Sequence, residues 1–143
     1  MYRRTQGDVE VFLVHPGGPF WASKDLGAWS VPKGEYLDTE QPLAAAKREF
    51  HEETGFDVPD DCVELGVIKQ AGGKIVSAWA FEGDGNPAEL TSNRCQMEWP
   101  PHSGRAIDFP EVDRGAWFPI EAARERILKS QQPFLDALLL KLH

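Results

Sequence analysis

Hydrophobic residues along the chain fall into short runs separated by turn-forming residues. The first run, residues 9–14 (VEVFLV), is compact and rich in β-branched side chains. Gln6-Gly7-Asp8 precedes it and His15-Pro16-Gly17-Gly18-Pro19 follows it. This pattern predicts a buried strand that leads into a rigid loop.

A helix is predicted over residues 41–54, where alanine, glutamate and other helix-favouring residues dominate. Pro42 fits the first turn of this helix, Thr39 is placed to cap it, and Gly55 is placed to end it.

Residues 63–69 and 74–81 have the composition of two strands, which Ala71-Gly72-Gly73 would join as an antiparallel hairpin. Residues 86–110 predict a long irregular loop instead, because prolines and a glycine interrupt them at Pro87, Pro100, Pro101 and Gly104.

The C-terminal part of the chain predicts two helices, since residues 119–129 and 133–142 each open with a proline and have helical apolar spacing. The order of strand, helix, strands and helices, without an internal repeat or a polar linker, indicates a single α/β domain over residues 1–143.

Composition narrows the class of protein and its partners. At 143 residues, the chain is long enough to fold without disulfides or metal, and its two cysteines are too few for a disulfide framework. A formal net charge of −8 argues against nucleic acid as a partner. No segment approaches the roughly 18 apolar residues of a membrane span, and the N-terminus lacks the apolar core of a signal peptide. We therefore expect a cytoplasmic protein.

Three carboxylates gather on one face of the predicted helix, because Glu49, Glu52 and Glu53 stand at positions i, i+3 and i+4. A row of glutamates is typical of a solvated helix face as well, since glutamate is a good helix former. Like charges this close nevertheless repel unless a cation lies among them, and carboxylate oxygens suit Mg²⁺ or Mn²⁺. The pattern therefore raises the hypothesis of a divalent-metal site.

The segment 34–56 resembles the signature of the Nudix hydrolase family. That signature is a glycine, five residues, a glutamate, seven residues, Arg-Glu, an apolar residue, any residue, Glu-Glu, any residue, a glycine and an apolar residue. The chain meets every position, with Gly34, Glu40, Arg48, Glu49, Phe50, Glu52, Glu53, Gly55 and Phe56. At typical residue usage, seven fixed identities coincide by chance with a probability of about 10⁻⁸ per starting position.

The resemblance extends beyond this box. Residues 29–34 (WSVPKG) are similar to a common Nudix lead-in, and residues 109–118 are similar to the late strand that precedes the C-terminal helix. Together with HPGGPFW and MEWPP, they resemble a bacterial branch of predicted nucleotide pyrophosphohydrolases. The resemblance implies a Nudix-type α/β/α sandwich with a mixed sheet and a catalytic loop-helix-loop. Related domains usually begin with a full strand, so we expect a clipped first strand after Met1.

The resemblance also implies a role for each residue of the box. The metal ligands would be the three carboxylates and one carbonyl, holding one to three Mg²⁺ ions: Glu49, Glu52, Glu53 and Gly34. Arg48 would orient a glutamate, because a guanidinium has no lone pair for a metal. Glu40 would brace the loop, Gly55 would end the helix, and Glu49 is the first choice for general base.

A further acidic residue often comes from the late loop in this family, and two residues compete for that role. Glu111 lies six residues before Trp117, where relatives often place it, and Glu98 lies beside Trp99. Glu111 is the preferred candidate as ligand or base, and the remaining alternative is that both glutamates are solvated.

Substrate contacts are sought among basic and aromatic residues. Lys33 is a candidate for a phosphate oxygen, and the alternative is an ordinary surface lysine. Candidates for stacking a base are Phe20, Trp21, Trp29 and Trp99, of which Trp21 and Trp99 are preferred because they lie in predicted loops. Further positive charge for phosphates would come from Arg94, Arg105 and Arg114. The four histidines show no metal-binding spacing.

The function expected from this resemblance is Mg²⁺-dependent hydrolysis of a nucleoside diphosphate linked to another group, with dinucleoside polyphosphates and nucleoside triphosphates first, by a monomer or homodimer. Three alternatives remain. The net charge disfavours an RNA 5′-end pyrophosphohydrolase. The intact box disfavours a catalytically silent nucleotide-binding module. An isoprenoid diphosphate isomerase would release no phosphate product.

Overall fold

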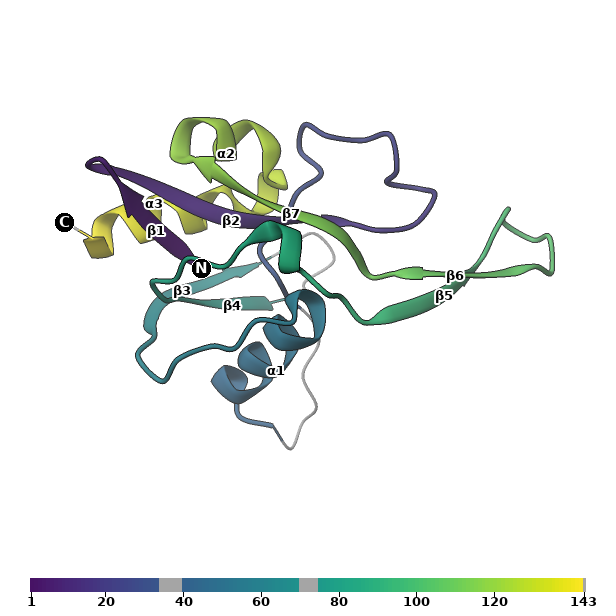
Figure 1. The fold of residues 1–143 in the computed structure, drawn as a ribbon, viewed down its shortest axis with the longest axis horizontal. Helices are drawn as coiled ribbons and strands as arrows, with labels where there is room; N and C mark the ends of the chain where they lie inside the picture. The colour runs from purple at the N-terminus through teal and green to yellow at the C-terminus, as the bar shows by residue number, and fades with distance from the viewer. Residues whose placement is uncertain (34–39, 70–74, 143) are drawn as a thin grey trace.

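The computed structural model describes residues 1–33, 40–69 and 75–142, and Figure 1 shows their arrangement. An antiparallel sheet has the order β1 (Tyr2–Thr5), β2 (Asp8–Pro16) and β7 (Val112–Pro119). One hairpin consists of β3 (Val63–Lys69) and β4 (Ile75–Ala80), and a second of β5 (Arg94–Glu98) and β6 (Ala106–Pro110). The helices are α1 (Pro42–Thr54), α2 (Ile120–Arg126) and α3 (Gln132–Leu142), and 3-10 turns cover Pro87–Glu89 and Lys129–Gln131.

The helices form two layers around the strands: α1 lies on one side, and α2 and α3 lie on the other (Figure 1). This arrangement confirms the α/β sandwich. The parallel component of the expected mixed sheet is limited, among the described residues, to isolated bridges between Tyr2 and Glu82 and between Trp29 and Ile127.

Strand β2 lies at the centre of the core and buries both of its faces. Val11 and Leu13 belong to the larger apolar cluster, which includes residues of α2 and α3. Phe12 and Val14 point to the opposite face, where they pack with Val112 of β7. A strand that is buried on both faces needs a continuous apolar run, which is why VEVFLV is a reliable strand signal.

Helix α1 confirms the sequence prediction and ends as expected. Gly55 adopts a left-handed conformation with φ 79°, and its N–H donates to the carbonyl of His51 over 2.7 Å. The predicted cap Thr39 lies outside the described residues; Gln41 takes the cap position and makes no side-chain capping hydrogen bond.

The prediction of an irregular loop over residues 86–110 is wrong, because β5 and β6 pair within it. Cys95 lies opposite Phe109, and Met97 lies opposite Ile107, so one face of the hairpin is apolar. Pro100, Pro101 and Gly104 fall in its connection, where a missing N–H costs no ladder bond. The hairpin extends away from the rest of the molecule (Figure 1).

The remaining elements follow the predictions: β3 has the predicted bounds, β4 and α2 are shorter, and α3 begins one residue earlier. The expected hairpin forms from β3 and β4, while its connecting residues 70–74 lie outside the described part. The helix expected over 119–129 ends at Arg126. Within the described residues, no helix is both long enough and apolar enough to cross a membrane.

Candidate functional site

The acidic face of α1 is unevenly buried. The side chain of Glu52 is 38% exposed and that of Glu49 only 12%. Glu53, the next-to-last residue of α1, is buried. The helical spacing therefore places three carboxylates on one face, as predicted, and the tertiary structure gives each a different environment.

Arg48 balances the charge of Glu49 and Glu52 on this face. Its guanidinium donates to both carboxylate oxygens of Glu40 over 2.9 Å, a bidentate pair. Nη1 also donates to Glu49 over 2.9 Å and to Glu52 over 3.2 Å. The hydrogen bonds with Glu40, and then those with Glu52, raise the pKa of Arg48. Arg48 thus ties the segment before α1 to two of the box carboxylates.

Glu53 has no such partner for one of its oxygens. Among the described residues, its Oε2 is buried without a hydrogen-bond partner. Burial, followed by the charges of Glu111 and Glu49, raises the pKa of Glu53 to about 9, against the opposing effects of the Lys33 charge and backbone. Burial likewise raises the pKa of Glu49, with Arg48 acting in the opposite direction. A buried carboxylate among like charges is a good site for a cation.

Glu111 reaches this cluster through a chain of backbone hydrogen bonds. Its N–H donates to the carbonyl of Asn93 over 2.9 Å, and the N–H of Asn93 donates to the carbonyl of Glu52 over 2.7 Å. Thr91 bonds in the same way to Thr54, the last residue of α1. The short segment 91–93 therefore joins the end of the helix to the start of β7.

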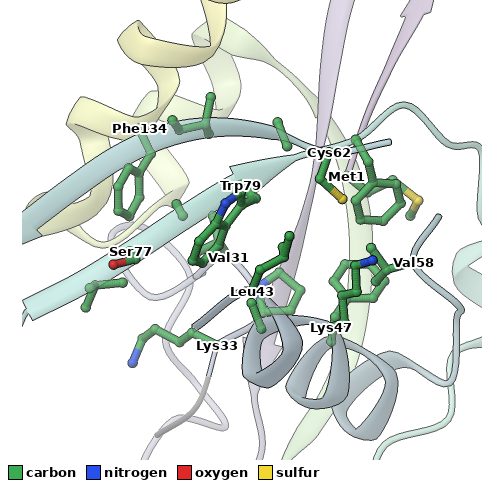
Figure 2. A pocket seen from close by; sticks show the side chains of 18 of the residues that line it. Met1, Val31, Lys33, Leu43, Lys47, Val58, Cys62, Ser77, Trp79 and Phe134 are labelled. Atoms are coloured by element: carbon green, nitrogen blue, oxygen red, sulfur yellow. The ribbon is translucent and has the colours of Figure 1, made fainter. Parts of the chain in front are cut away.

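Two adjoining cavities contain the candidate residues. The smaller, of about 250 Å³, is lined by Trp21, Lys33, Glu53 and Glu111, together with apolar residues of β2 and β7. The larger, of about 560 Å³, lies between α1, the β3–β4 hairpin and β2. Lys33 and Glu111 line both. Figure 2 shows Trp79 and Leu43 projecting into the larger cavity.

Several predicted residues lie elsewhere. Glu98 and Trp99 belong to the projecting β5–β6 hairpin and line neither cavity. Trp29, one of the two less favoured stacking candidates, is only 4% exposed and belongs to the core. Phe20 is 52% exposed, with the Lys24 ammonium 4.0 Å from its ring centre.

The three arginines predicted to supply positive charge for phosphates form ion pairs with aspartates or lie outside both cavities. Arg94 pairs with Asp108 on the hairpin, and Arg114 pairs with its neighbour Asp113. Arg105 lies in the connection directly before β6 and lines neither cavity. Gly34, the predicted carbonyl ligand, lies outside the described residues.

The acidic cluster fits a divalent cation by its chemistry, although its side chains do not converge on one point. Among the described residues, no three His, Cys, Asp or Glu side chains are arranged as a ligand set. Arg48 draws the oxygens of Glu49 and Glu52 toward itself. Hard oxygens, an orphaned buried oxygen on Glu53 and mutual repulsion are the properties that a bound Mg²⁺ or Mn²⁺ would satisfy.

Two residues near the site were not among the predicted ones. Trp79 lines the larger cavity from β4, and the apolar pattern of its strand does not distinguish it from a core residue. His15 was set aside for lack of metal spacing, yet it is fully buried between Asp113 and the carbonyl of Lys24. A histidine at the end of an apolar run, directly before Pro-Gly-Gly, is the signal that could have identified it.

Comparisons with known proteins agree with the fold and the box. A family model described as NUDIX domain matches residues 2–138. An RNA pyrophosphohydrolase of Agrobacterium fabrum is 29% identical over an alignment of 153 residues, gaps included, which covers 89% of this chain and 83% of that protein. An RNA pyrophosphohydrolase of Rhizobium meliloti is 27% identical over an alignment of 138 residues, which covers 78% of this chain and 77% of that protein.

Solved structures share the architecture at lower identity. The NUDIX domain of Shewanella oneidensis NrtR, complexed with ADP ribose, has a TM-score of 0.66 at 16% identity and covers 99% of this chain and 83% of that one. The binary complex of a C. elegans Ap4A hydrolase has a TM-score of 0.66 at 19% identity, covering 99% and 92%. These similarities concern the fold.

Proposed function

The chain belongs to the NUDIX domain family and is a hydrolase of phosphoanhydride bonds, and from that premise we propose that it is a Mg²⁺-dependent pyrophosphohydrolase of small nucleotides. The observation that carries the proposal is the junction of the two cavities. Glu53, Glu111 and Lys33 meet in a small cleft, and Lys33 and Glu111 also border a larger apolar cavity.

The metal would be held by Glu49, Glu52, Glu53 and Glu111, with the Gly34 carbonyl as the further ligand that the box implies. The orphaned oxygen of Glu53 and its raised pKa support this donor set. When bound, the metal lowers the pKa of water and neutralises charge that develops on phosphoryl oxygens.

The chain's own residues supply the proton acceptor and the orientation. Glu49 is the first choice for general base, and the burial that raises its pKa makes it a better acceptor near neutral pH. Arg48 holds Glu49 and Glu52 in place, and Glu40 holds Arg48. Lys33 contributes the positive charge at the mouth that both cavities share.

A compact nucleotide substrate is supported by the size and lining of the cavities. A volume of about 560 Å³ lies in the range of small-molecule sites. Trp79 in the larger cavity and Trp21 in the smaller are available to stack a base, and stacking discriminates weakly among bases. We place dinucleoside polyphosphates and nucleoside triphosphates first, ahead of sugar nucleotides.

A second candidate is the 5′ end of triphosphorylated RNA, because curated relatives at 26–29% identity act as RNA pyrophosphohydrolases. The net charge of −8 opposes a long polyanion. An RNA end and a mononucleotide share the same reacting group, so the two candidates differ only in what lies beyond the phosphates.

A product-resolved screen tests the proposal. Purified protein is incubated with Mg²⁺ and dinucleoside polyphosphates, nucleoside triphosphates, sugar nucleotides, 5′-triphosphate RNA or isoprenoid diphosphates, and Glu52→Gln is the control for contaminating activity. We expect release of a mononucleotide and a phosphate-containing product from the first two classes. Preference for RNA ends over every mono- and dinucleotide transfers the proposal to the second candidate. Isomerisation without phosphate release, or no turnover at all, contradicts both.

A further inference from the structure

Four consecutive residues, His15 to Gly18, lie alongside residues 109–113 and contact them in order. A Cβ on Gly18 would meet the Phe109 ring at 2.8 Å. A Cβ on Gly17 would overlap the carbonyl oxygen of Pro110, so only glycine fits there. Pro16 pairs with Val112, and the Nδ1 of His15 lies 3.0 Å from Oδ1 of Asp113. This is the HPGG segment of the sequence, which the chemistry of the box leaves without a role.

Glu111 is held at both of its backbone groups within this contact. Its carbonyl accepts from the N–H of Gly17 over 2.9 Å. Its own N–H donates to Asn93, which is bonded in turn to Glu52 of α1. The backbone of Glu111 is therefore fixed between the acidic helix on one side and Gly17 on the other.

A bulge next to Glu111 directs Asp113 toward His15. In the ladder of β2 and β7, His15 pairs with Arg114 and Pro16 with Val112, which leaves Asp113 as the extra residue. Bulges bend a strand and redirect its side chains, often beside active sites. Here the bulge lies two residues after Glu111.

His15 connects this bulge to the loop that carries Trp21. The imidazole is fully buried, and its Nε2 lies 2.6 Å from the carbonyl of Lys24. A carbonyl oxygen only accepts, so Nε2 carries a proton and donates it. An apolar side chain could fill this buried space, but it would leave the Lys24 carbonyl and the Asp113 carboxylate without the ring nitrogens that lie next to them.

We infer that His15-Pro16-Gly17-Gly18 is a positioning element that sets Glu111 against Glu53, with His15 acting on the reaction through Glu111. The inference rests on the proposed role of Glu111 in catalysis. None of the four residues needs to touch the substrate for this effect, because the contacts with residues 109–113 determine where the Glu111 carboxylate lies.

A double-mutant cycle separates positioning from general stability. His15→Leu and Glu111→Gln are made singly and together, and hydrolysis of a dinucleoside tetraphosphate is followed with Mg²⁺, with folding checked by thermal melting. We expect Glu111→Gln to lower kcat about 100-fold. His15→Leu should lower kcat about 10-fold with KM within about two-fold, and it should cost less than about two-fold further in the Glu111→Gln background.

Asp113→Ala removes the contact between His15 and Asp113 by changing the partly exposed Asp113 instead of the buried His15. If His15→Leu does not fold, Asp113→Ala takes its place in the cycle. Asp113→Asn keeps an acceptor oxygen and should restore kcat to within about three-fold of wild type. Asp108→Ala, which removes a carboxylate from the β5–β6 hairpin, is the matched control and should leave kcat unchanged.

The outcomes distinguish the inference from the function on which it rests. Wild-type kcat in both Asp113→Ala and His15→Leu overturns the positioning role. A loss of kcat from His15→Leu that is as large in the Glu111→Gln background as in the wild-type protein overturns it too. Wild-type kcat in Glu111→Gln overturns it as well but leaves the hydrolase intact. Absence of hydrolysis by the wild-type protein of every substrate in the product-resolved screen overturns the proposed function itself.

Discussion

The two ends of the acidic face of α1 balance their charge in different ways. At the end next to Arg48, the guanidinium bridges Glu49 and Glu52 to Glu40, so the chain supplies its own cation. At the buried end, one oxygen of Glu53 has no hydrogen-bond partner within the described part of the chain. Arg48 thus satisfies the first end within the protein, whereas the second end offers an oxygen to the proposed metal ion.

Replacing the carboxylate at each end with its amide is the strongest test of this difference. Glu53→Gln and Glu52→Gln should each lower kcat by about 10²–10⁴-fold, the range for single catalytic groups. Only Glu53→Gln should also raise the melting temperature of the metal-free protein, because a neutral amide at this buried position does not ionise next to Glu111 and Glu49. Activity assays and thermal melting in chelator measure both effects. Near wild-type activity in either variant contradicts the metal site.

The second prediction compares Glu111 with Glu98 as partners of the buried end. Glu111→Gln should lower kcat by about 100-fold and change KM far less, since its interaction matters most in the transition state. Glu98→Gln is the control and should be nearly silent, because Glu98 lies on the projecting hairpin. Steady-state kinetics decide, and the reverse ranking would move the role to Glu98.

The pH dependence of stability sharpens the comparison without any assay of turnover. Burial and the charges of Glu111 and Glu49 raise the pKa of Glu53 from 4.5, the ordinary value for a glutamate, to about 9 in the folded chain, so the folded state holds a proton that the unfolded state loses. Stability of the metal-free protein should therefore be greatest below about pH 4.5 and fall until about pH 9 through this group. Chemical denaturation across this range, with Glu53→Gln as the variant that lacks this component, measures the slope.

Added Mg²⁺ should stabilise the wild-type protein more as the pH rises, because a metal needs the ionised carboxylate. The same titration with Glu53→Gln should show a much smaller metal effect. A Mg²⁺-induced shift in melting temperature that is equal in both proteins and independent of pH would contradict binding at the buried end.

The smallest predicted effect concerns the walls of the site. Trp21 lines the cleft of Glu53, while Trp99 lies on the hairpin. A stacking contact of about 1 kcal/mol predicts that Trp21→Ala raises KM about five-fold with little change in kcat. From the sequence, Trp99 was an equal candidate for stacking a base, so Trp99→Ala serves as the control. An unchanged KM in Trp21→Ala removes base stacking from this wall.

Local signals in the sequence predicted most elements and failed at the β5–β6 hairpin and at Trp29. The strand at 9–14, the helix ended by Gly55 and the β3–β4 hairpin follow from apolar runs, helix formers and turn residues. The β5–β6 hairpin was missed because prolines in its connection resemble those of an irregular loop. The sequence left Trp29 open between the core and a stacking role, because nothing adjacent to it shows that Ile127 and the rest of the core cover it.

The sequence by itself determined that Glu49, Glu52 and Glu53 share a helix face, because helical periodicity relates residues only three and four apart. The sequence also places Arg48 beside glutamates of the same box, from which a role in orienting a glutamate was predicted. Only the tertiary structure decided that Glu53 is buried and that Glu111, rather than Glu98, lies beside it. The reason is that burial and proximity there depend on backbone hydrogen bonds between α1, Asn93 and Gly17, segments far apart in the chain, which no local pattern encodes.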